Sequence, residues 1–400
     1  MVHGTQGMSI VRRYQLVFTF VVIASVPLSW LFYRLTEKQL CQHGLCNIPI
    51  GREPFPPMFH DDVSYINSSN LKIILLWSGF YTHSNKQWPT KLGRINCGEY
   101  QCLLSDDRSL YEKSSALIFH HRSKWLQQLP TNRPRSQDQV WVLYNIESSW
   151  WGPKGKELDP ANGLINWTMG LRRDNDIRIP TATVTRGKFL DGFDPNRNYL
   201  ENKPNDVAIL MSTCYLFGPR GYNARMYYLK LLTSKGLNVH HFGDCGKQCG
   251  NDVKCAEKLK TYKFYLAFEN TICDDYISEK AYYNGLQLGT VPIVLSGANL
   301  TDPHVLPPGS FINVRGFANS SQLTNYITKV ASNPQLYSTF FEWRNKWTFK
   351  ISMVKEGFLP MYDDHFCPLC RHLHANVAHK SISNLQKWHD QQKCYPYPST

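Results

Sequence analysis

Apolar and polar positions alternate from residue 71 onward in a pattern that predicts strands and helices in turn. Short apolar runs, which are typical of buried strands, cover residues 71–77, 116–119, 140–144, 176–180, 207–211, 239–242, 262–268 and 291–295. Apolar residues at helical spacing predict helices over residues 224–232, 276–288, 323–331 and 336–349. Strands that alternate with helices favour parallel sheets with helices on both faces, so the expected fold class is α/β.

Polar and proline-bearing stretches divide the chain. Residues 198–205 have this character and predict a boundary between two α/β domains, at residues 66–203 and 204–355. Several prolines interrupt residues 34–65, which we expect to form a stem. Residues 356–400 hold a Cys-x-x-Cys segment and a polar tail, and we expect the tail from about residue 375 to be less ordered.

The N-terminal region contains a run that is long enough to cross a membrane. Residues 14–33 are mostly apolar and free of charge, and they follow Arg12 and Arg13. A helix of this length spans about 30 Å, the thickness of the hydrocarbon core, and basic residues favour a cytosolic side for residues 1–13. The alternative is a cleaved signal peptide with an apolar core at residues 16–26, but no clear cleavage site follows. We therefore expect an uncleaved type II anchor.

The charge balance limits the partners. The chain carries 44 Lys and Arg against 31 Asp and Glu, a formal net charge of +13. Such a charge fits nucleic acid, an anionic membrane or an anionic small substrate. The sequence has no block of basic residues and no zinc-finger spacing, so we exclude nucleic acid and expect an anionic small molecule.

Asparagine and cysteine patterns indicate a secretory compartment. Sequons begin at Asn67, Asn166, Asn299 and Asn319, all after the expected anchor. Twelve cysteines are present, and in an oxidising compartment most of them should pair.

The cysteine partners are not set by spacing. Close pairs occur at Cys41/Cys46, Cys97/Cys102, Cys245/Cys249 and Cys367/Cys370. Cys367 and Cys370 could pair with each other or with Cys97 and Cys102. Together with His365, His372 and His374 they also fit a zinc site.

Candidate chemistry gathers in residues 264–297, which read FYLAFENTICDDYISEKAYYNGLQLGTVPIVLSG. Glu269 and Asn270 follow the first strand, and Tyr276, Glu279 and Lys280 would share one face of the predicted helix. Ligands of open α/β sheets lie at the carboxyl ends of strands, and anions lie at helix N-termini. The alternative is a solvated Glu–Lys surface pair.

Two further segments carry candidate residues. Glu147 ends an apolar strand and precedes Trp150 and Trp151. Burial beside aromatic rings would raise the pKa of the Glu147 carboxyl and make it a usable base, although a strand-end cap is an equal alternative. Arg225 lies on the helix at residues 224–232, where its planar fork could meet a phosphate; a surface arginine is the alternative.

These segments resemble the signature of the α1,3-fucosyltransferases, glycosyltransferase family 10, and the chain looks like an invertebrate-type Golgi member. The family pattern is F-x-x-x-F-E-N-S, D-Y, T-E-K and V-P-V-V; here Thr271 and Ser278 keep the hydroxyl of the family residue. The element W-V-x-x-x-x-E-S matches at residues 141–148, and A-R-x-x-Y-Y-x-x-L matches at residues 224–232 except for Leu229. A third element, N-x-T-M-x-Y-R-R-D-S-D-I, matches at residues 166–177 except for Leu171 and Asn175.

The resemblance implies a GT-B fold, with two Rossmann-like domains facing a cleft, and transfer of fucose from GDP-L-fucose to the 3-hydroxyl of GlcNAc. It implies that Glu147 is the base and that Arg225 and Lys280 contact the diphosphate. Glu279 would hold donor hydroxyls, while Asn270 and Tyr276 would support the donor pocket. Trp150 and Trp151 are candidate acceptor contacts.

The resemblance also bears on location and cofactors. It implies a catalytic domain on the lumenal side of the Golgi membrane, anchored by residues 14–33. No bound cofactor is expected, and a divalent metal could stimulate the enzyme without being required. The acceptor, either the core GlcNAc of N-glycans or a Lewis-type antenna, is left open.

Two alternatives remain beside this interpretation. Asp174-Asn175-Asp176 fits the D-x-D pattern of metal-dependent GT-A enzymes that bind Mn²⁺. Arg172 and Arg173 could contact the donor or the acceptor, but we expect them to pair with these aspartates in a structural role. The second alternative is a catalytically idle glycan-binding protein. The presence of all four residues Glu147, Arg225, Glu279 and Lys280 favours an active enzyme.

Overall fold

The computed structural model describes residues 71–80, 88–211, 222–250, 252–352, 365–375 and 380–398. The expected anchor at residues 14–33, the stem at residues 34–65 and the sequon at Asn67 lie outside these ranges. Among the helices within them, none combines the length and the apolar character that a membrane span needs.

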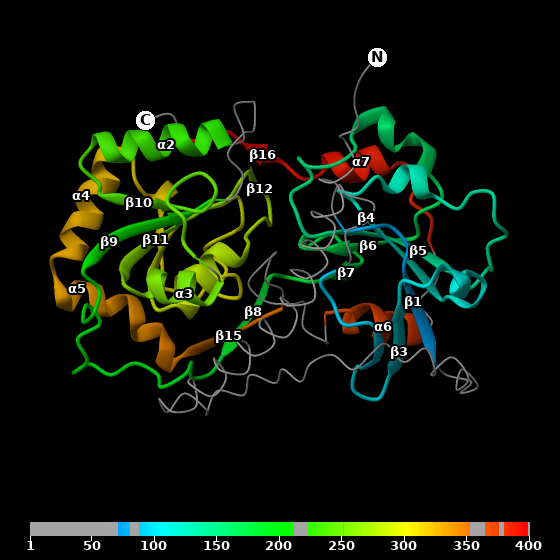
Figure 1. Ribbon diagram of the computed structural model, residues 1–400, viewed down its shortest axis with the longest axis horizontal. Helices are drawn as coiled ribbons and strands as arrows, with labels where there is room; N and C mark the ends of the chain where they lie inside the picture. Colours follow the sequence, from blue (N-terminus) through cyan, green and yellow to red (C-terminus); the bar gives the residue numbers. More distant parts are fainter. Residues whose placement is uncertain are drawn as a thin grey trace, which may run out of the picture. The chain divides into compact units, whose positions relative to one another are not determined.

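The first sheet is built from seven strands (Figure 1). These are β1 (Lys72–Leu76), β2 (Gly93–Asn96), β3 (Gln101–Ser105), β4 (Ala116–His120), β5 (Val140–Asn145), β6 (Trp167–Gly170) and β7 (Ile177–Arg178). Their spatial order is β2-β3-β1-β4-β5-β6-β7, and only the β2–β3 pair is antiparallel.

The second sheet has five parallel strands. They are β9 (Asn205–Leu210), β10 (Val239–Phe242), β11 (Tyr262–Phe268), β13 (Val291–Leu295) and β14 (Ile312–Asn313), in the order β10-β9-β11-β13-β14. The predicted α/β class with two separate sheets is confirmed. Each apolar run that predicted a strand lies in one of these sheets.

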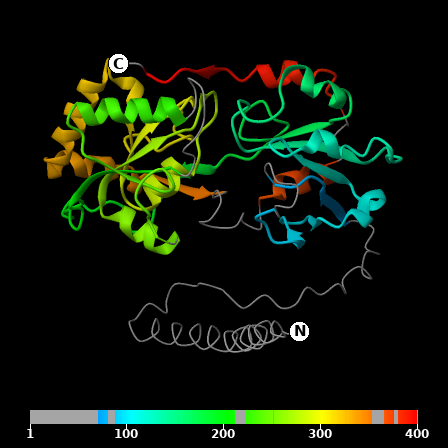
Figure 2. The ribbon, with the colours of Figure 1, turned by 45° about the horizontal axis from the view of Figure 1, so that its top comes forward.

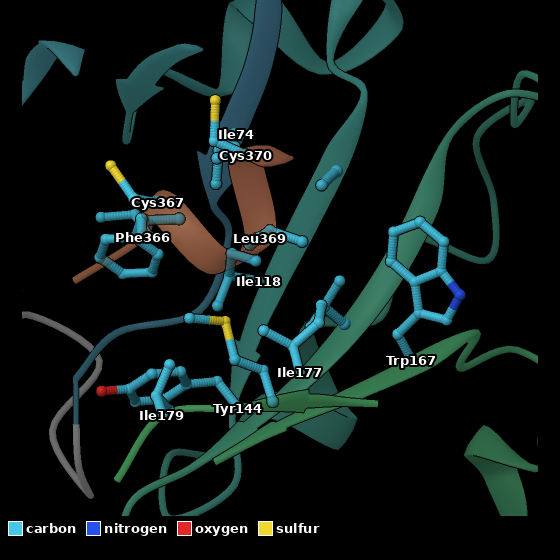
Figure 3. Close-up of a cluster of buried hydrophobic side chains, with 14 of the residues drawn as sticks. Ile74, Ile118, Tyr144, Trp167, Ile177, Ile179, Phe366, Cys367, Leu369 and Cys370 are labelled. Atoms are coloured by element: carbon cyan, nitrogen blue, oxygen red, sulfur yellow. The ribbon is translucent and has the colours of Figure 1, made fainter. Parts of the chain in front are cut away.

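Both faces of the first sheet are covered, because successive residues of a strand point to opposite sides. Ile74 and Ile118 pack against Leu369 of α6 (Cys367–His374) on one face, as Figure 3 shows. Leu75 and Leu117 pack on the other face. There they meet η2 (Arg108–Lys113), η3 (Trp125–Gln128), η4 (Gly155–Ala161) and α7 (Leu385–Asp390).

Both faces of the second sheet are also covered by helices. Val207 and Phe264 face α2 (Tyr222–Ser234), α4 (Ser320–Ala331), α5 (Pro334–Ser338) and η7 (Thr339–Asn345). Ala208 and Tyr265 face α3 (Asp252–Lys260) and η5 (Lys280–Gln287). The helix predicted at residues 224–232 is α2, and Gly236, with a φ of 95°, follows its end.

Strand order identifies where ligands are expected. In the second sheet the chain moves from β9 to β10 on one side and then to β11 on the other. A reversal of this kind opens a crevice beyond the carboxyl ends of the two inner strands. The residues that follow β11 are Glu269 and Asn270.

Two predicted helices are wrong in their bounds. The helix expected at residues 276–288 is η5, a π-helix that begins at Lys280. Asp275 has a left-handed φ of 60°, so the chain cannot be helical there. The helix expected at residues 336–349 ends with η7. Trp347–Ile351 then forms β15, which pairs antiparallel with β8 (Ala182–Arg186).

The C-terminal tail is more structured than we expected. It contains α7, with Leu385 fully buried, and β16 (Cys394–Tyr395), which pairs antiparallel with β12 (Ile272–Cys273). Figure 2 shows this segment running from the first-sheet elements to the second. Buried apolar side chains in the tail, including Tyr397, explain its order.

The disulfides decide between the cysteine alternatives. Cys97 pairs with Cys367 and Cys102 with Cys370, so the Cys-x-x-Cys segment is bound to the first sheet. Zinc needs free thiolates, and the zinc interpretation is therefore wrong. Within the described part of the chain, the one group with metal-site spacing consists of Cys102, Cys370 and His374. Its two cysteines are bonded to each other, so they are not available as thiolate ligands.

Two further bridges were not predicted. Cys249 pairs with Cys255, so it is not bonded to its near neighbour Cys245, and Cys273 pairs with Cys394. The last bridge joins the strand pair β12–β16 and so connects the tail to the second sheet.

Candidate functional site

Glu147 lies where residues of the two sheets meet. Its side chain is 1% exposed, and one carboxylate oxygen accepts a 2.7 Å hydrogen bond from the Tyr276 hydroxyl. The Asn270 amide lies 3.4 Å from the same oxygen, and Arg122 lies 3.3 Å from the other. A carboxylate from the first sheet is thus held by residues that follow a strand of the second.

The backbone after β5 fixes the position of Glu147. Its N–H donates to Asn145 Oδ1 at 3.0 Å. A Cβ on Gly170, in the neighbouring strand β6, would lie 2.0 Å from the carbonyl oxygen of Asn145. Only glycine leaves room for this close approach, so Gly170 supports the turn that carries Glu147.

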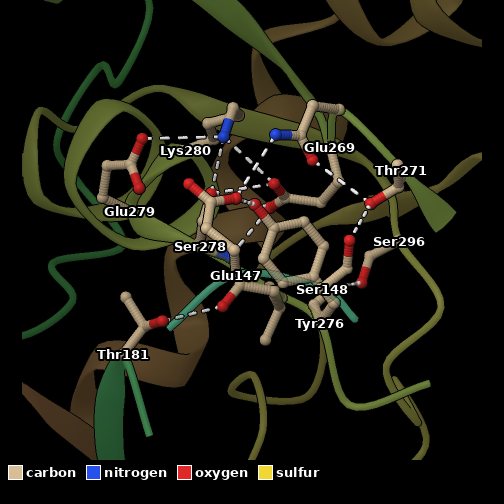
Figure 4. A network of polar contacts seen from close by, with 12 residues as sticks. Glu147, Ser148, Thr181, Glu269, Thr271, Tyr276, Ser278, Glu279, Lys280 and Ser296 are labelled. Atoms are coloured by element: carbon tan, nitrogen blue, oxygen red, sulfur yellow. Dashed lines mark hydrogen bonds and ion pairs between the residues drawn. The ribbon is translucent and has the colours of Figure 1, made fainter. Parts of the chain in front are cut away.

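A second buried carboxylate, Glu269, occupies the end of β11 (Figure 4). Its oxygens accept from Ser278 N at 2.8 Å and from Ser278 Oγ at 2.9 Å. Lys280 Nζ lies 3.0 Å from Glu269 and 2.7 Å from Ser278 Oγ. Glu269 therefore orients the first residue of η5.

Tyr276, Glu279 and Lys280 were predicted to share one face of a helix. Only Lys280 lies within η5, and the other two residues precede it. Lys280 Nζ lies 3.6 Å from Glu279, which is the residue just before η5. Tyr276 precedes the helix and is buried, with its hydroxyl on Glu147. Burial and the charge of Glu147 raise the pKa of Tyr276 well above its usual value, so it stays a hydrogen-bond donor.

Arg225 is buried in the first part of α2. Its Nε has no hydrogen-bond partner among the described residues. Its charge acts on Tyr397, whose hydroxyl donates to the Glu269 carbonyl oxygen. An unsatisfied buried guanidinium N–H is costly, and an anion beside Glu269 and Lys280 would satisfy it.

The two tryptophans lie in the loop that follows Glu147. Trp150 lies under Lys154 Nζ, 3.9 Å from the ring centre, and Trp151 lies 5.1 Å from the Arg122 guanidinium carbon. Arg122 in turn reaches Glu147. Trp151 is therefore linked to the carboxylate through Arg122.

The sequons differ in their surroundings. Asn166 is buried, and its amide group is used by the fold: Oδ1 accepts from Trp141 N at 2.8 Å, and Nδ2 donates to Lys380 O at 2.8 Å. Asn299 and Asn319 are exposed. The folded chain thus offers positions 299 and 319 at its surface and corrects the expectation for Asn166.

The D-x-D carboxylates take part in structural contacts. Asp174 pairs with Arg172 at 2.5 Å, and Asp176 accepts from Thr168 N at 2.8 Å and pairs with Lys380 at 2.5 Å. The structural role expected for Arg172 is confirmed.

Arg173 was assigned the wrong partners. It pairs with Asp275 at 3.2 Å and Asp302 at 2.6 Å. These contacts join the loop after β6 to the loop before η5. They also hold the left-handed Asp275 that delays the helix.

Several residues near the site were missed. Arg122 follows two buried histidines, His120 and His121, at the end of β4. Burial lowers the pKa of each histidine to about 3. In the tail, Gln392 accepts from Ser149 N at 2.7 Å and donates to Asp274 O at 2.5 Å, bridging the two sheets. Sequence spacing gives no indication of such long-range contacts.

The chain matches two family models. Residues 200–388 match the C-terminal model of glycosyltransferase family 10 (fucosyltransferase), and residues 69–182 match the N-terminal fucosyltransferase model. Together they cover most of the chain and both sheets.

Curated relatives are also similar. The 4-galactosyl-N-acetylglucosaminide 3-alpha-L-fucosyltransferase 9 of Mus musculus is 34% identical over 291 residues, covering 72% of this chain and 74% of the relative. The alpha-(1,3)-fucosyltransferase 4 of Homo sapiens is 29% identical over 355 residues, covering 79% and 64%. A crystal structure of an alpha1,3-fucosyltransferase with GDP-fucose covers 82% of this chain and 96% of that one, with 14% identity and a TM-score of 0.45.

Proposed function

The chain belongs to glycosyltransferase family 10, the fucosyltransferases, and we propose that it transfers L-fucose from GDP-L-fucose to the 3-hydroxyl of GlcNAc with inversion. One observation carries the assignment of the catalytic centre. Glu147, from the first sheet, is held in a buried position by Tyr276 and Asn270, which follow β11 of the second. This arrangement supports a base that lies between an acceptor side and a donor side.

The proposed chemistry is a single displacement. The acceptor 3-hydroxyl oxygen forms a bond to C1 of fucose while the bond from C1 to the diphosphate oxygen breaks. The hydroxyl proton passes to Glu147, and the electron pair of the broken bond leaves with GDP. Tyr276 donates to one carboxylate oxygen and Arg122 lies near the other, so both favour an ionised carboxylate that is ready to accept a proton.

The leaving group needs positive charge. Lys280, whose position is fixed by Glu269 and Ser278, supplies one cation, and the buried Arg225 supplies a planar fork of donors. Preorganised donors of this kind stabilise charge that develops on the diphosphate. Glu279, 3.6 Å from Lys280, would bind donor hydroxyls, and Trp150 and Trp151 would contact the acceptor sugar.

Metal dependence is a separate question. The D-x-D carboxylates are engaged by Arg172, Thr168 and Lys380, which supports a mechanism in which Arg225 and Lys280 neutralise the diphosphate. A divalent metal could still stimulate turnover, and activity in EDTA tests that.

A Golgi location completes the proposal. Four disulfides within the described residues support an oxidising compartment. Residues 14–33 would anchor the chain as a type II membrane protein, with residues 66–203 on the acceptor side and 204–355 on the donor side. The relatives named for a 4-galactosyl-N-acetylglucosaminide acceptor favour a Lewis-type antenna over the N-glycan core.

The test uses the full-length chain in detergent with GDP-fucose and EDTA. N-acetyllactosamine and a core N-glycan glycopeptide serve as acceptors, and mass spectrometry locates any added fucose. We expect transfer to the 3-hydroxyl of GlcNAc in EDTA. Activity that requires Mn²⁺ would contradict the metal-free mechanism. GDP binding without transfer to either acceptor would favour the glycan-binding alternative.

A further inference from the structure

A cavity of about 490 Å³ lies at the opposite edge of the second sheet from the donor site. Its wall includes Lys203 and Thr261, which precede β9 and β11, whereas Glu269 and Asn270 follow β11. Much of the remaining wall comes from the loop at residues 190–202, and the rest comes from α3, η7 and the end of η5. Since parallel strands place all their carboxyl ends on one edge, this cavity is distinct from the site that contains Glu147.

Lys203 brings one partly buried cation to the cavity. Its Nζ donates to the carbonyl oxygens of Lys260 at 2.8 Å and Tyr262 at 3.1 Å. Among the residues that the structure describes, no carboxylate forms an ion pair with it. Burial, followed by repulsion from Arg344 and Arg197, lowers the pKa of Lys203 to about 8.

Arg344 brings a second cation, and it is 8% exposed. Its Nε is buried with no hydrogen-bond partner in the described chain. The guanidinium carbon lies 5.1 Å from the Phe341 ring centre and 5.4 Å from that of Phe189, which offsets part of the cost of burial. Burial also lowers the pKa of Arg344.

The acidic residues of the wall form no ion pair with these two cations within the described ranges, although the charge of Asp191 attracts Arg344. Glu257 is paired with Lys260 at 2.7 Å. Asp191 and Glu201 line the cavity, but neither forms an ion pair with Lys203 or Arg344 within the described ranges. Two buried like charges without a counterion destabilise a fold, and a bound anion would remove that cost.

We propose that this cavity binds an acidic saccharide, with its oxyanion between Lys203 and Arg344. The arginine fork suits a sulfate, phosphate or carboxylate group. The cavity is larger than one anion and lies within the usual size range for small-molecule sites, about 300–1,000 Å³. Tyr199 and Phe341 also belong to its wall, but they are buried and stacked on each other with ring centres 4.4 Å apart, so the saccharide assignment rests on the size of the cavity and on its two cations.

The test measures binding of inorganic sulfate, N-acetylglucosamine 6-sulfate and neutral N-acetylglucosamine to the full-length chain. Saturating GDP keeps the anions out of the donor site, and the ionic strength is held constant. We expect both sulfates to bind and the neutral sugar not to bind at this site. Arg344→Gln should weaken sulfate binding about tenfold or more, since a charge-assisted hydrogen bond is lost.

Matched variants keep the test decisive if Arg344→Gln unfolds. Arg197 is exposed at the rim, so Arg197→Ala should fold and weaken sulfate binding by a smaller factor. Arg94→Ala, which removes an exposed arginine of β2, should leave it unchanged. Fucosyl transfer to a neutral acceptor should be unaffected by Arg197→Ala, which separates this site from the proposed catalytic centre.

The affinity for sulfate should also depend on pH. It should fall as the pH rises through about 8, because Lys203 loses its proton there, and Lys203→Gln should remove this dependence. The other charged groups that face the cavity are Asp191, Arg197, Glu201, Glu257, Lys260 and Arg344.

Three outcomes would overturn the proposal in whole or in part. If no sulfate binds in the presence of GDP, or if binding is equal in wild type, Arg344→Gln and Arg197→Ala, the site does not exist. If inorganic sulfate binds but the sugar sulfate does not, the saccharide assignment is wrong and a simple oxyanion site remains.

Discussion

Glu147 and Glu269 hold equivalent positions in the two sheets but have different surroundings. Each follows a buried strand, and the side chain of each is 1% exposed. Glu269 accepts from Ser278 and lies 3.0 Å from Lys280. Glu147 accepts a short hydrogen bond from Tyr276, and its contacts with Arg122 and Asn270 are longer.

The difference separates a structural carboxylate from a reactive one. Glu269 is held on both oxygens by groups of its own β-α-β unit, so a proton transfer to it would break the arrangement that positions Lys280. Glu147 is held by residues of the opposite sheet and by an arginine whose side chain is 23% exposed. A carboxylate with longer contacts can accept a proton at low cost, and this is why we assign the base to Glu147.

Replacing the two carboxylates in turn should have its largest effect on the free energy of unfolding. Glu269→Gln removes the counter-charge of the mostly buried Lys280, and we expect a loss of about 3 kcal/mol in the free energy of unfolding. Glu147→Gln should cost only about 1 kcal/mol. Denaturant unfolding of the two variants measures both, and equal losses would mean that the two carboxylates have the same role.

The next effect concerns the leaving group. Lys280→Ala should lower kcat by about 10²-fold, as expected when one donor to a developing anion is removed, and should weaken GDP binding. Steady-state kinetics and GDP titration measure the two effects. Lys263→Ala, at a lysine paired with Asp206, is the matched control and should change neither. An unchanged kcat in Lys280→Ala would remove Lys280 from the mechanism.

A smaller effect should follow from loosening Glu147. Tyr276→Phe removes the 2.7 Å hydrogen bond, and we expect kcat to fall about tenfold, because hydrogen bonds to charged groups contribute about 1.5–3 kcal/mol. The carboxylate loses a donor, so its pKa rises and the acid limb of the kcat profile moves to higher pH. Tyr228→Phe, on α2, should leave the profile in place. If the acid limb did not move in Tyr276→Phe, Tyr276 would not act through Glu147.

A separate effect on stability should appear at acid pH, in the sheet that carries Glu147. Burial lowers the pKa of His120 and His121 to about 3. These folded-state values lie below the unfolded one, so stability is present above about pH 6.5 and falls as the pH drops below it. Each histidine should cost about 1.4 kcal/mol per pH unit below that point. Unfolding at pH 7.0 and 5.5 tests this, and His121→Gln should reduce the difference. An equal difference in wild type and variant would contradict it.

The sequence alone predicted that Glu147 and Glu269 each lie at the end of a strand. The run around residues 264–297 predicted the strand that delivers Glu269 and Asn270, and the apolar strand before Glu147 predicted its place at a strand end. Both follow from local patterns, since a continuous apolar run and the polar residue after it define a strand and its carboxyl end.

The remaining features depend on contacts between distant segments. The helix was predicted to begin at Tyr276, but residues 276–278 are not helical, and the Tyr276 hydroxyl and the Ser278 N–H donate to Glu147 and Glu269. Arg122 and Gln392 reach the site from other parts of the chain. The tail was expected to be loose because it is polar, yet the Cys273–Cys394 bridge and the buried Tyr397 order it. Spacing along the sequence does not encode these pairings.

The most direct test of the account is the turnover of Glu147→Gln at saturating GDP-fucose and acceptor, with GDP affinity measured on the same preparation. General-base assistance contributes about 10²–10⁴-fold, so we predict a loss of kcat in that range with GDP binding nearly unchanged. Retention of most of the wild-type kcat would contradict the assignment of Glu147 as the base.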